Sequence, residues 1–208
     1  LVNAGPTHEK LDPVRFIGNY SSGKMGKAIA NELSSRGAMV HLVLGPVSAD
    51  GLDTKIHLTK IESAQEMYKA CSEIFTTCDA AILSAAVADY RPASQEDQKI
   101  KKKTEEFNLE LVKTVDVLKS LGEIKKNHQF LAGFALETQN EQENALLKLE
   151  KKNLDFIILN SMNDKGAGFG KDTNKITILE KNGKKHTFET KPKKDVAIDI
   201  VNLLATYL

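Results

Sequence analysis

The chain has few cysteines, no tryptophan and no long apolar run. Cys71 and Cys78 are its two cysteines, and on one continuous helix they would lie two turns apart, too far to bridge readily. Separated thiols fit a reducing compartment, so we expect a cytoplasmic protein. No apolar run reaches the ~20 residues that span a bilayer, and no basic, apolar leader opens the chain, so we expect no membrane partner.

The sequence motifs of several enzyme classes are also missing. The chain has no C-x-x-C, H-E-x-x-H or G-x-S-x-G, and its histidines lack metal-ligand spacing, so metal hydrolysis and serine nucleophile chemistry lose support. The first strand is followed by Gly5-Pro6-Thr7 instead of G-x-G-x-x-G, which leaves NAD binding as an alternative based on fold alone. A formal net charge of +1 gives no global attraction to nucleic acid, so an anionic ligand needs a local cluster of cations.

What the chain does contain suits one domain over residues 1–208, with 41% hydrophobic and 27% charged residues. Periodicity predicts strands and helices in alternation: strands at 1–4, 39–44, 56–61, 80–86, 130–136 and 156–159, and helices at 22–36, 64–75, 115–126, 140–152 and 195–207. A hairpin at 175–180 and 185–190 turns at Asn182-Gly183. This order predicts an α/β fold: a Rossmann-like, doubly wound, mostly parallel sheet with helices on both faces and ligands at its carboxyl edge.

Residues 94–111 interrupt that alternation. They predict a two-stranded excursion, formed by the lysine-rich segment 99–103 and the alternating segment 107–111. Its apolar face needs a surface to pack on, and another subunit is a candidate, so we expect a dimerisation hairpin here. The lysine run is either a solvated face or includes a lysine that pairs with a polyphosphate, and the lack of interleaved aromatics argues against nucleic-acid binding.

The segment 12–26 joins an apolar stretch to an amphipathic helix and contains residues typical of phosphate binding. Ser21 or Ser22 can cap the helix, Gly23 permits close approach, and the first helical N–H groups attract anions. Residues 18–25 read G-x-x-x-x-G-K-M, in which Met25 replaces the magnesium-binding hydroxyl of a P-loop. We therefore interpret it as a phosphate loop that is not a Walker motif; the alternative is an ordinary capped helix with a solvated Lys24.

Two further polar features are candidates. Asp89 follows the third buried strand, where it either contacts a ligand or caps a turn. Lys148 and Lys152 lie four residues apart, so both ammonium groups leave one helix face and repel each other unless an anion lies between them. Solvation with help from neighbouring glutamates is the alternative.

Several segments resemble one family when they are taken together. They are Ala4-Gly5-Pro6-Thr7, Asp12-Pro13-Val14-Arg15, residues 19–26, Ala85-Ala86-Val87-Ala88-Asp89-Tyr90-Arg91, Lys99-Ile100-Lys101-Lys102, Gly133-Phe134-Ala135 with Glu137-Thr138, and Lys152-Asn153-Leu154-Asp155. These motifs cover nearly the whole chain. It resembles phosphopantothenoylcysteine synthetase, also called phosphopantothenate cysteine ligase, the CTP-dependent C-terminal domain of bacterial bifunctional coenzyme A biosynthesis flavoproteins.

The resemblance implies a homodimeric ligase that joins 4'-phosphopantothenate to L-cysteine. CTP, with Mg²⁺, activates the carboxylate as an acyl-cytidylate and releases pyrophosphate before the amine attacks. No flavin is expected in this chain, and Leu1, already inside a strand pattern, leaves open whether a tag, disordered residues or an upstream flavin-dependent decarboxylase domain precedes it.

The resemblance also carries over site residues. Asn19 and Lys99 are implied as catalytic, with Lys99 on a flap within 99–111, and both suit a developing negative charge. Arg15, Asn19 and Ala86 are implied on the pantothenate side, with Ser21, Ser22 and Gly23 as the phosphate loop. The implied CTP contacts are Leu83, Ser84, Ala85, Asp89, Lys99, Val115, Asp116, Val117, Leu118, Phe134, Lys148 and Lys152. Val115 departs from the family, which usually has proline there, and metal ligands stay unassigned.

A different class of function stays open. A Rossmann-like module that binds a nucleotide without catalysis would keep the phosphate loop but would not need Asn19 and Lys99 together. Release of pyrophosphate separates the two hypotheses.

Overall fold

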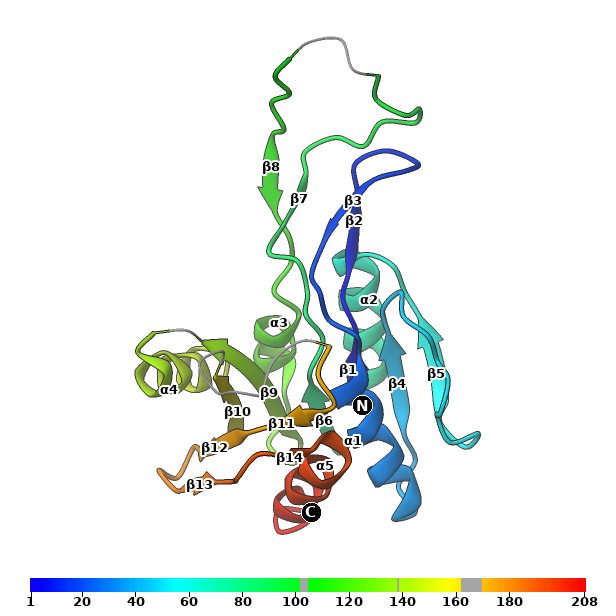
Figure 1. The fold of residues 1–208 in the computed structure, drawn as a ribbon. Coiled ribbons are helices and arrows are strands. Elements are labelled where there is room, and N and C mark those ends of the chain that lie inside the picture. Colours follow the sequence, from blue (N-terminus) through cyan, green and yellow to red (C-terminus); the bar gives the residue numbers. More distant parts are fainter. Residues whose placement is uncertain (102–104, 138, 162–169) are drawn as a thin grey trace.

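The computed structural model describes residues 1–101, 105–137, 139–161 and 170–208. At its centre is an eight-stranded sheet with the order β13-β12-β10-β9-β6-β1-β4-β5 (Figure 1). The strands from β10 to β5 in that order pair in parallel, and β12 and β13 add an antiparallel edge. The sheet strands are β1 Val2–Ala4, β4 His41–Leu44, β5 His57–Lys60, β6 Ala80–Leu83, β9 Phe130–Glu137, β10 Phe156–Ser161, β12 Ile176–Glu180 and β13 Lys185–Thr187.

Helices cover both faces of this sheet. They are α1 Lys24–Ser35, α2 Ala64–Phe75, α3 Val117–Ile124, α4 Glu141–Lys151 and α5 Lys193–Leu204. Residues of β4 alternate between two cores: Leu42 and Leu44 pack with α1 and α5, while Val43 packs with α2, α3 and α4. This alternation follows from the period of two in a strand, and it confirms the predicted mostly parallel, doubly wound α/β fold.

Some predicted boundaries were wrong. The cap of α1 is Gly23, in a left-handed conformation at φ 70°, and neither serine caps the helix; instead the Ser21 hydroxyl accepts a bond from the Gly23 N–H at 3.4 Å. The predicted bounds of α2 are confirmed: the helix ends at Phe75, so Cys78 lies outside it. Both cysteines are free, and burial raises the pKa of the Cys71 thiol to about 12.

Two antiparallel ladders project together from the sheet (Figure 1). β2 His8–Lys10 pairs with β3 Phe16–Gly18, and β7 Tyr90–Pro92 pairs with β8 Leu111–Lys113. We call these four strands and the segments between them, 11–15 and 93–110, the arm. The strands expected at 99–103 and 107–111 were placed wrongly. The observed pairing joins Tyr90–Pro92 to Leu111–Lys113, closer to the sheet. Residues 102–104 of the predicted strand lie outside the described residues. In the segment 99–101, Ile100 is the one apolar residue and stands between two lysines, so the segment offers little apolar area for cross-strand contacts.

A short two-stranded ladder precedes α5. β11 Thr173–Asn174 pairs with β14 Lys191–Pro192, directly before α5. This pairing places the described end of the glycine-rich loop, Gly170 to Asp172, beside the start of α5, and the Lys193 N–H donates to the Asp172 carbonyl at 2.9 Å. Residues 162–169 of that loop lie outside the described residues.

Candidate functional site

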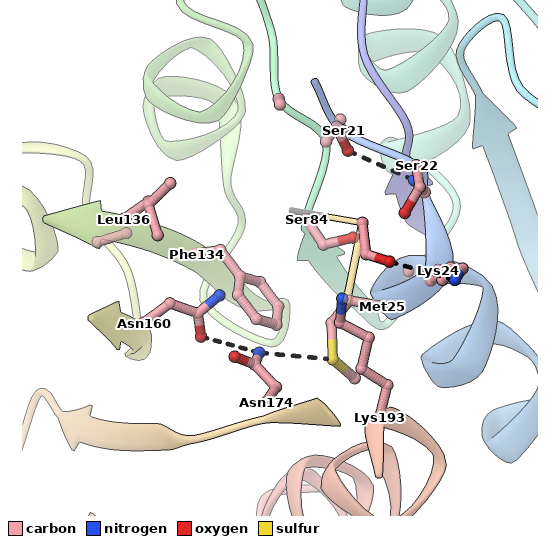
Figure 2. Close-up of a pocket in the computed structure, with 16 residues that line it drawn as sticks. Ser21, Ser22, Lys24, Met25, Ser84, Phe134, Leu136, Asn160, Asn174 and Lys193 are labelled. Carbon is pink, nitrogen blue, oxygen red and sulfur yellow. Dashed lines mark hydrogen bonds between the residues drawn. The ribbon is translucent and has the colours of Figure 1, made fainter. Parts of the chain in front are cut away.

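A pocket of about 130 Å³ opens at the carboxyl edge of the sheet (Figure 2). Its walls come from the segment before α1, from the residues after β6, from β9 and from the start of α5. Seven of the site residues that the resemblance implies line it: Ser21, Ser22, Gly23, Ser84, Ala85, Ala86 and Phe134. The edge of a parallel sheet is therefore the place where the phosphate loop and the strand-end loop meet, as expected for this fold class.

Buried polar groups set the shape of the loop after β6. The Asn3 side-chain carbonyl accepts the Ala85 N–H at 2.9 Å, and the Asn3 backbone carbonyl accepts the Ser84 hydroxyl at 2.7 Å. The Thr7 hydroxyl accepts the Ala88 N–H at 3.0 Å. Asn3 and Thr7 are 1% and 0% exposed, so these bonds are shielded from water and hold the loop firmly.

The first turn of α1 packs closely against the ends of β1 and β6 because Gly26 has no side chain. A Cβ at Gly26 would lie 2.4 Å from the Ser84 Oγ and 2.5 Å from the Ala4 Cβ. The first turn of α1 can approach β1 and β6 this closely only without that atom. The spacing of glycines in the phosphate loop therefore serves packing as well as ligand access.

Asn19 lies beside this pocket wall. Its side-chain Nδ2 donates to the Ala86 carbonyl at 2.9 Å, and the Thr7 N–H donates to the same oxygen at 3.3 Å. Two of the residues implied on the pantothenate side, Asn19 and Ala86, are thus in direct contact.

Arg15 and Lys99 lie elsewhere, on the arm. The Asp12 carboxylate is buried and accepts bonds from the Arg15 guanidinium and, at 3.1 Å, from the Ile100 N–H; Arg15 Nη2 in turn donates to the Ile100 carbonyl at 3.1 Å. The hydrogen bond from Arg15 holds the pKa of Asp12 far below its ordinary value. Lys99 is exposed next to Ile100 and does not line the pocket.

The predicted pair Lys148 and Lys152 lies on a further surface. Lys152 follows the end of α4 and its Nζ pairs with Asp116 at 2.9 Å, while Lys148 is within α4. Asp116 also caps α3 by accepting the Lys119 N–H at 3.0 Å. Leu118 packs against Gly133, next to Phe134. This group therefore borders β9 without lining the pocket.

The remaining predicted residues differ in what they can contact. Val117 and Leu83 are 2% and 5% exposed, so a ligand could reach them mainly through backbone atoms. Val115 is half-buried, and Asp89 is exposed at the base of the arm, where its carbonyl accepts the Thr114 N–H at 3.0 Å.

Sequence reasoning missed several pocket residues. Asn160 and Asn174 are joined by a 3.1 Å bond from Asn174 Nδ2 to Asn160 Oδ1, and Met25 lies beside them (Figure 2). Asn160 directly follows the strand predicted at 156–159, which is a signal of the kind used for Asp89. Lys193 also lines the pocket, and nothing in its local sequence indicates that position.

Lys24, which the sequence left between solvent and a ligand, is paired in the structure. Its Nζ lies 2.6 Å from Asp172 Oδ1 and 3.3 Å from the Gly170 carbonyl. The hydrogen bond from Lys24 lowers the pKa of the Asp172 carboxyl below its ordinary value.

Metal and membrane features were searched for in the described ranges. Within them no three His, Cys, Asp or Glu side chains gather as metal ligands would. In the same part of the chain, no helix combines the length and apolar character that crossing a bilayer requires.

Comparisons with known proteins extend over the whole chain. A family model described as "DNA/pantothenate metabolism flavoprotein C-terminal domain" matches residues 1–208. The Bacillus subtilis (strain 168) "Coenzyme A biosynthesis bifunctional protein CoaBC" is 44% identical over 205 residues, which are 99% of this chain and 50% of that protein. A "Cysteine/Cysteine sulfinic acid decarboxylase" of an unknown prokaryotic organism is 50% identical over 206 residues, 99% of this chain and 57% of that protein.

A solved structure agrees in both sequence and fold. The crystal structure of the C-terminal domain of "Coenzyme A biosynthesis bifunctional protein CoaBC" is 40% identical, with a TM-score of 0.82 and coverage of 98% of this chain and 91% of that one. The chain spans about half the length of the curated relatives above. It belongs to the family of the DNA/pantothenate metabolism flavoprotein C-terminal domain.

Proposed function

We propose that this chain is a phosphopantothenate cysteine ligase, which uses CTP to join 4'-phosphopantothenate to L-cysteine. The observation that carries the proposal is the contact between Asn19 and Ala86 at the rim of a pocket that the phosphate loop also lines. Substrate carboxylate and nucleotide phosphates must meet for the reaction, and here residues implied for each lie together. The identity of 44% to a bifunctional coenzyme A biosynthesis protein supports the same assignment.

The proposed reaction has two steps. A carboxylate oxygen of 4'-phosphopantothenate attacks the α-phosphorus of CTP; a C–O–P linkage forms and the bond to pyrophosphate breaks. The amine of cysteine then attacks the acyl carbon, the amide C–N bond forms, CMP leaves with the acyl oxygen, and the nitrogen loses a proton. Both steps develop negative charge on oxygen, which positioned donors stabilise.

Within this proposal, Asn19 presents an amide donor to the acyl group beside Ala86. Lys99 supplies a positive charge to the intermediate, and Arg15, which the Asp12 carboxylate orients, holds the pantothenate side. Ser84, Ala85 and Phe134 face the nucleotide. Lys148 and Lys152 contact the nucleotide from the surface beside β9.

Magnesium fits this site as a companion of the nucleotide. Mg²⁺ usually takes few protein ligands and keeps water and phosphate oxygens, so a group of three protein side chains is not required. When bound, it would offset charge on the phosphates during the first step. Asp172, which is paired with the pocket residue Lys24, is a carboxylate that could hold it.

The proposed assembly is a homodimer formed through the arm. Large apolar side chains are exposed on it, including Val14 at 61%, Phe16 at 53% and Phe107 at 59%. Such a cluster is typical of an interface. Lys99 does not line the pocket of its own chain, so in this proposal a dimer or a movement of the arm brings it to the reacting groups.

Product analysis tests the ligase proposal. The purified chain is incubated with CTP, Mg²⁺, 4'-phosphopantothenate and cysteine, and pyrophosphate, CMP and the amide are quantified. We expect all three in equal amounts, and a panel of CTP, ATP, GTP and UTP should show a preference for CTP. Binding of CTP without pyrophosphate release would instead identify a nucleotide-binding module without catalysis.

A further inference from the structure

Two lysines from different helices meet at one side of the pocket. Lys24 is the first residue of α1 and Lys193 is the first residue of α5, and both line the pocket (Figure 2). Both also bind the short segment 170–172. Lys24 Nζ lies 2.6 Å from Asp172 Oδ1, and Lys193 Nζ donates to the Lys171 carbonyl at 2.6 Å. Segments 148 residues apart are therefore joined at this point.

The positions of these lysines are electrostatically unfavourable for the helices themselves. The start of a helix has partial positive charge, so a cation in the first turn destabilises it, and α1 has no acidic residue there to compensate. Burial, together with the nearby charge of Lys24, lowers the pKa of the Lys193 ammonium. Departures from local preference of this kind are expected where a site has a function.

Asp172 is the more exposed partner of its ion pair with Lys24. Its side chain is 86% exposed, while that of Lys24 is 43% exposed, and an exposed ion pair is worth little. A phosphate group carries more charge than a carboxylate and presents more acceptor oxygens, so it binds two ammonium groups more strongly. The Asp172 carboxylate already faces solvent, whereas both lysines line the pocket.

We propose that Asp172 is an internal counter-ion, which a phosphate group of the nucleotide or of pyrophosphate displaces, so that Lys24 and Lys193 hold that phosphate. This inference rests on the proposed function and assigns its pyrophosphate-binding residues. Asp172 competes with the ligand for Lys24, which lowers affinity and speeds the departure of pyrophosphate after the first step.

Titration calorimetry with inorganic pyrophosphate tests the proposal on the whole chain. We expect Lys24→Gln and Lys193→Gln each to raise the dissociation constant about 10-fold, since each removes a charge-assisted bond. Lys194→Gln is the matched control: it removes the same charge from an exposed neighbour that does not line the pocket, and its constant should change less than twofold. Asp172→Asn should bind pyrophosphate several-fold more tightly than the wild type.

Each contrary result has a defined meaning. If the Lys24 and Lys193 variants bind as Lys194→Gln does, or if the wild type does not bind pyrophosphate at millimolar concentration, the phosphate assignment is wrong. If Asp172→Asn binds no more tightly, Asp172 is not a counter-ion. Lys24→Arg and Lys193→Arg keep the charge and should retain affinity, which separates a binding defect from misfolding. Pyrophosphate binding needs no turnover, so a wild type that binds it but forms no amide refutes only the ligase proposal.

Discussion

The side-chain amide of Asn19 donates a hydrogen bond of 2.9 Å to the backbone carbonyl of Ala86, across 67 residues of sequence. This bond links the end of the β2–β3 ladder to the loop after β6, at the rim of the pocket. The amide keeps a second N–H for a ligand, because a side-chain amide has two donors.

Asn19→Asp should lower turnover strongly with little effect on the fold. The change replaces both donors with a carboxylate, which faces the Ala86 carbonyl and repels a developing negative charge. Loss of one such donor typically costs about 10²-fold in turnover. Because Asn19 is exposed, we expect unfolding free energy to change by less than about 0.5 kcal/mol. Rates of amide formation and urea unfolding check both points, and a near-normal rate would refute the role of Asn19.

Asp12→Asn should release the flap segment. The variant loses the charge that pairs with Arg15 and weakens the acceptor for the Ile100 N–H. Misplacing Lys99 by about 1 Å could lower turnover by up to about 10²-fold, while CTP should still bind. Hydrogen exchange at residues 99–101 should accelerate. Asp97→Asn, an exposed carboxylate in the same segment, is the control, and equal effects in both variants would contradict a specific role for Asp12.

Gly26→Ala should destabilise the protein although alanine favours helices. The added Cβ would lie 2.4 Å from Ser84 Oγ and 2.9 Å from the Asn3 carbonyl, so α1 must shift away from the sheet. We expect a loss of about 1–3 kcal/mol, as for other overpacked sites. Ser35→Ala, on the exposed end of the same helix, provides the comparison in thermal unfolding. A more stable Gly26→Ala variant would show that the close approach is not present.

Glu180 accepts hydrogen bonds from Asn182, His186 and Tyr207. This group should make the free energy of unfolding depend on pH in both the acidic and the alkaline range. Burial by itself raises the pKa of Glu180, but hydrogen bonds from Tyr207, His186 and Asn182 lower it overall. Its folded pKa is below the unfolded value, so the stabilisation is present above about pH 4.5 and is lost as pH falls further. Burial and the bond to Glu180 raise the pKa of Tyr207 to about 12. That contribution is present below about pH 10 and is lost as pH rises towards 12.

Urea unfolding across pH checks these two directions. Glu180→Gln should be less stable than the wild type at pH 7, with a difference that shrinks below about pH 4.5. Tyr207→Phe should lose the alkaline dependence between about pH 10 and 12. Glu189→Gln changes an exposed glutamate and should follow the wild type throughout.

Phe16→Ser should shift the protein towards the monomer. Phe16 is 53% exposed on the arm and stacks on His8 at 3.6 Å between ring centroids. Removal of its apolar area from the proposed interface should raise the dimer dissociation constant by about 10-fold or more. Sedimentation velocity gives the readout. Met39→Ser, at 80% exposure outside the arm, is the control, and a wild type that stays monomeric would refute the dimer.

Local patterns predicted some elements closely and others poorly. The bounds 64–75 of α2 agree with the prediction, because Ser63 accepts the Glu66 N–H and Glu66 accepts the Glu62 N–H. The arm was predicted with the wrong strands, since strand pairing depends on partners far along the chain. The start of α1 was wrong by two residues, because the left-handed conformation of Gly23 has no unique signature among the neighbouring serines and glycines.

The sequence by itself determined the α/β class, the alternation of strands and helices, and the phosphate-loop residue types, because these depend on periodicity and capping within short windows. Only the tertiary structure decided that Asn19 contacts Ala86 and that Lys24 and Lys193 both bind the segment 170–172. Those contacts depend on the order of strands in the sheet and on the packing of α1 beside α5. No local pattern encodes which distant segments become neighbours, so Lys193 was recognised as a pocket residue only in the folded chain.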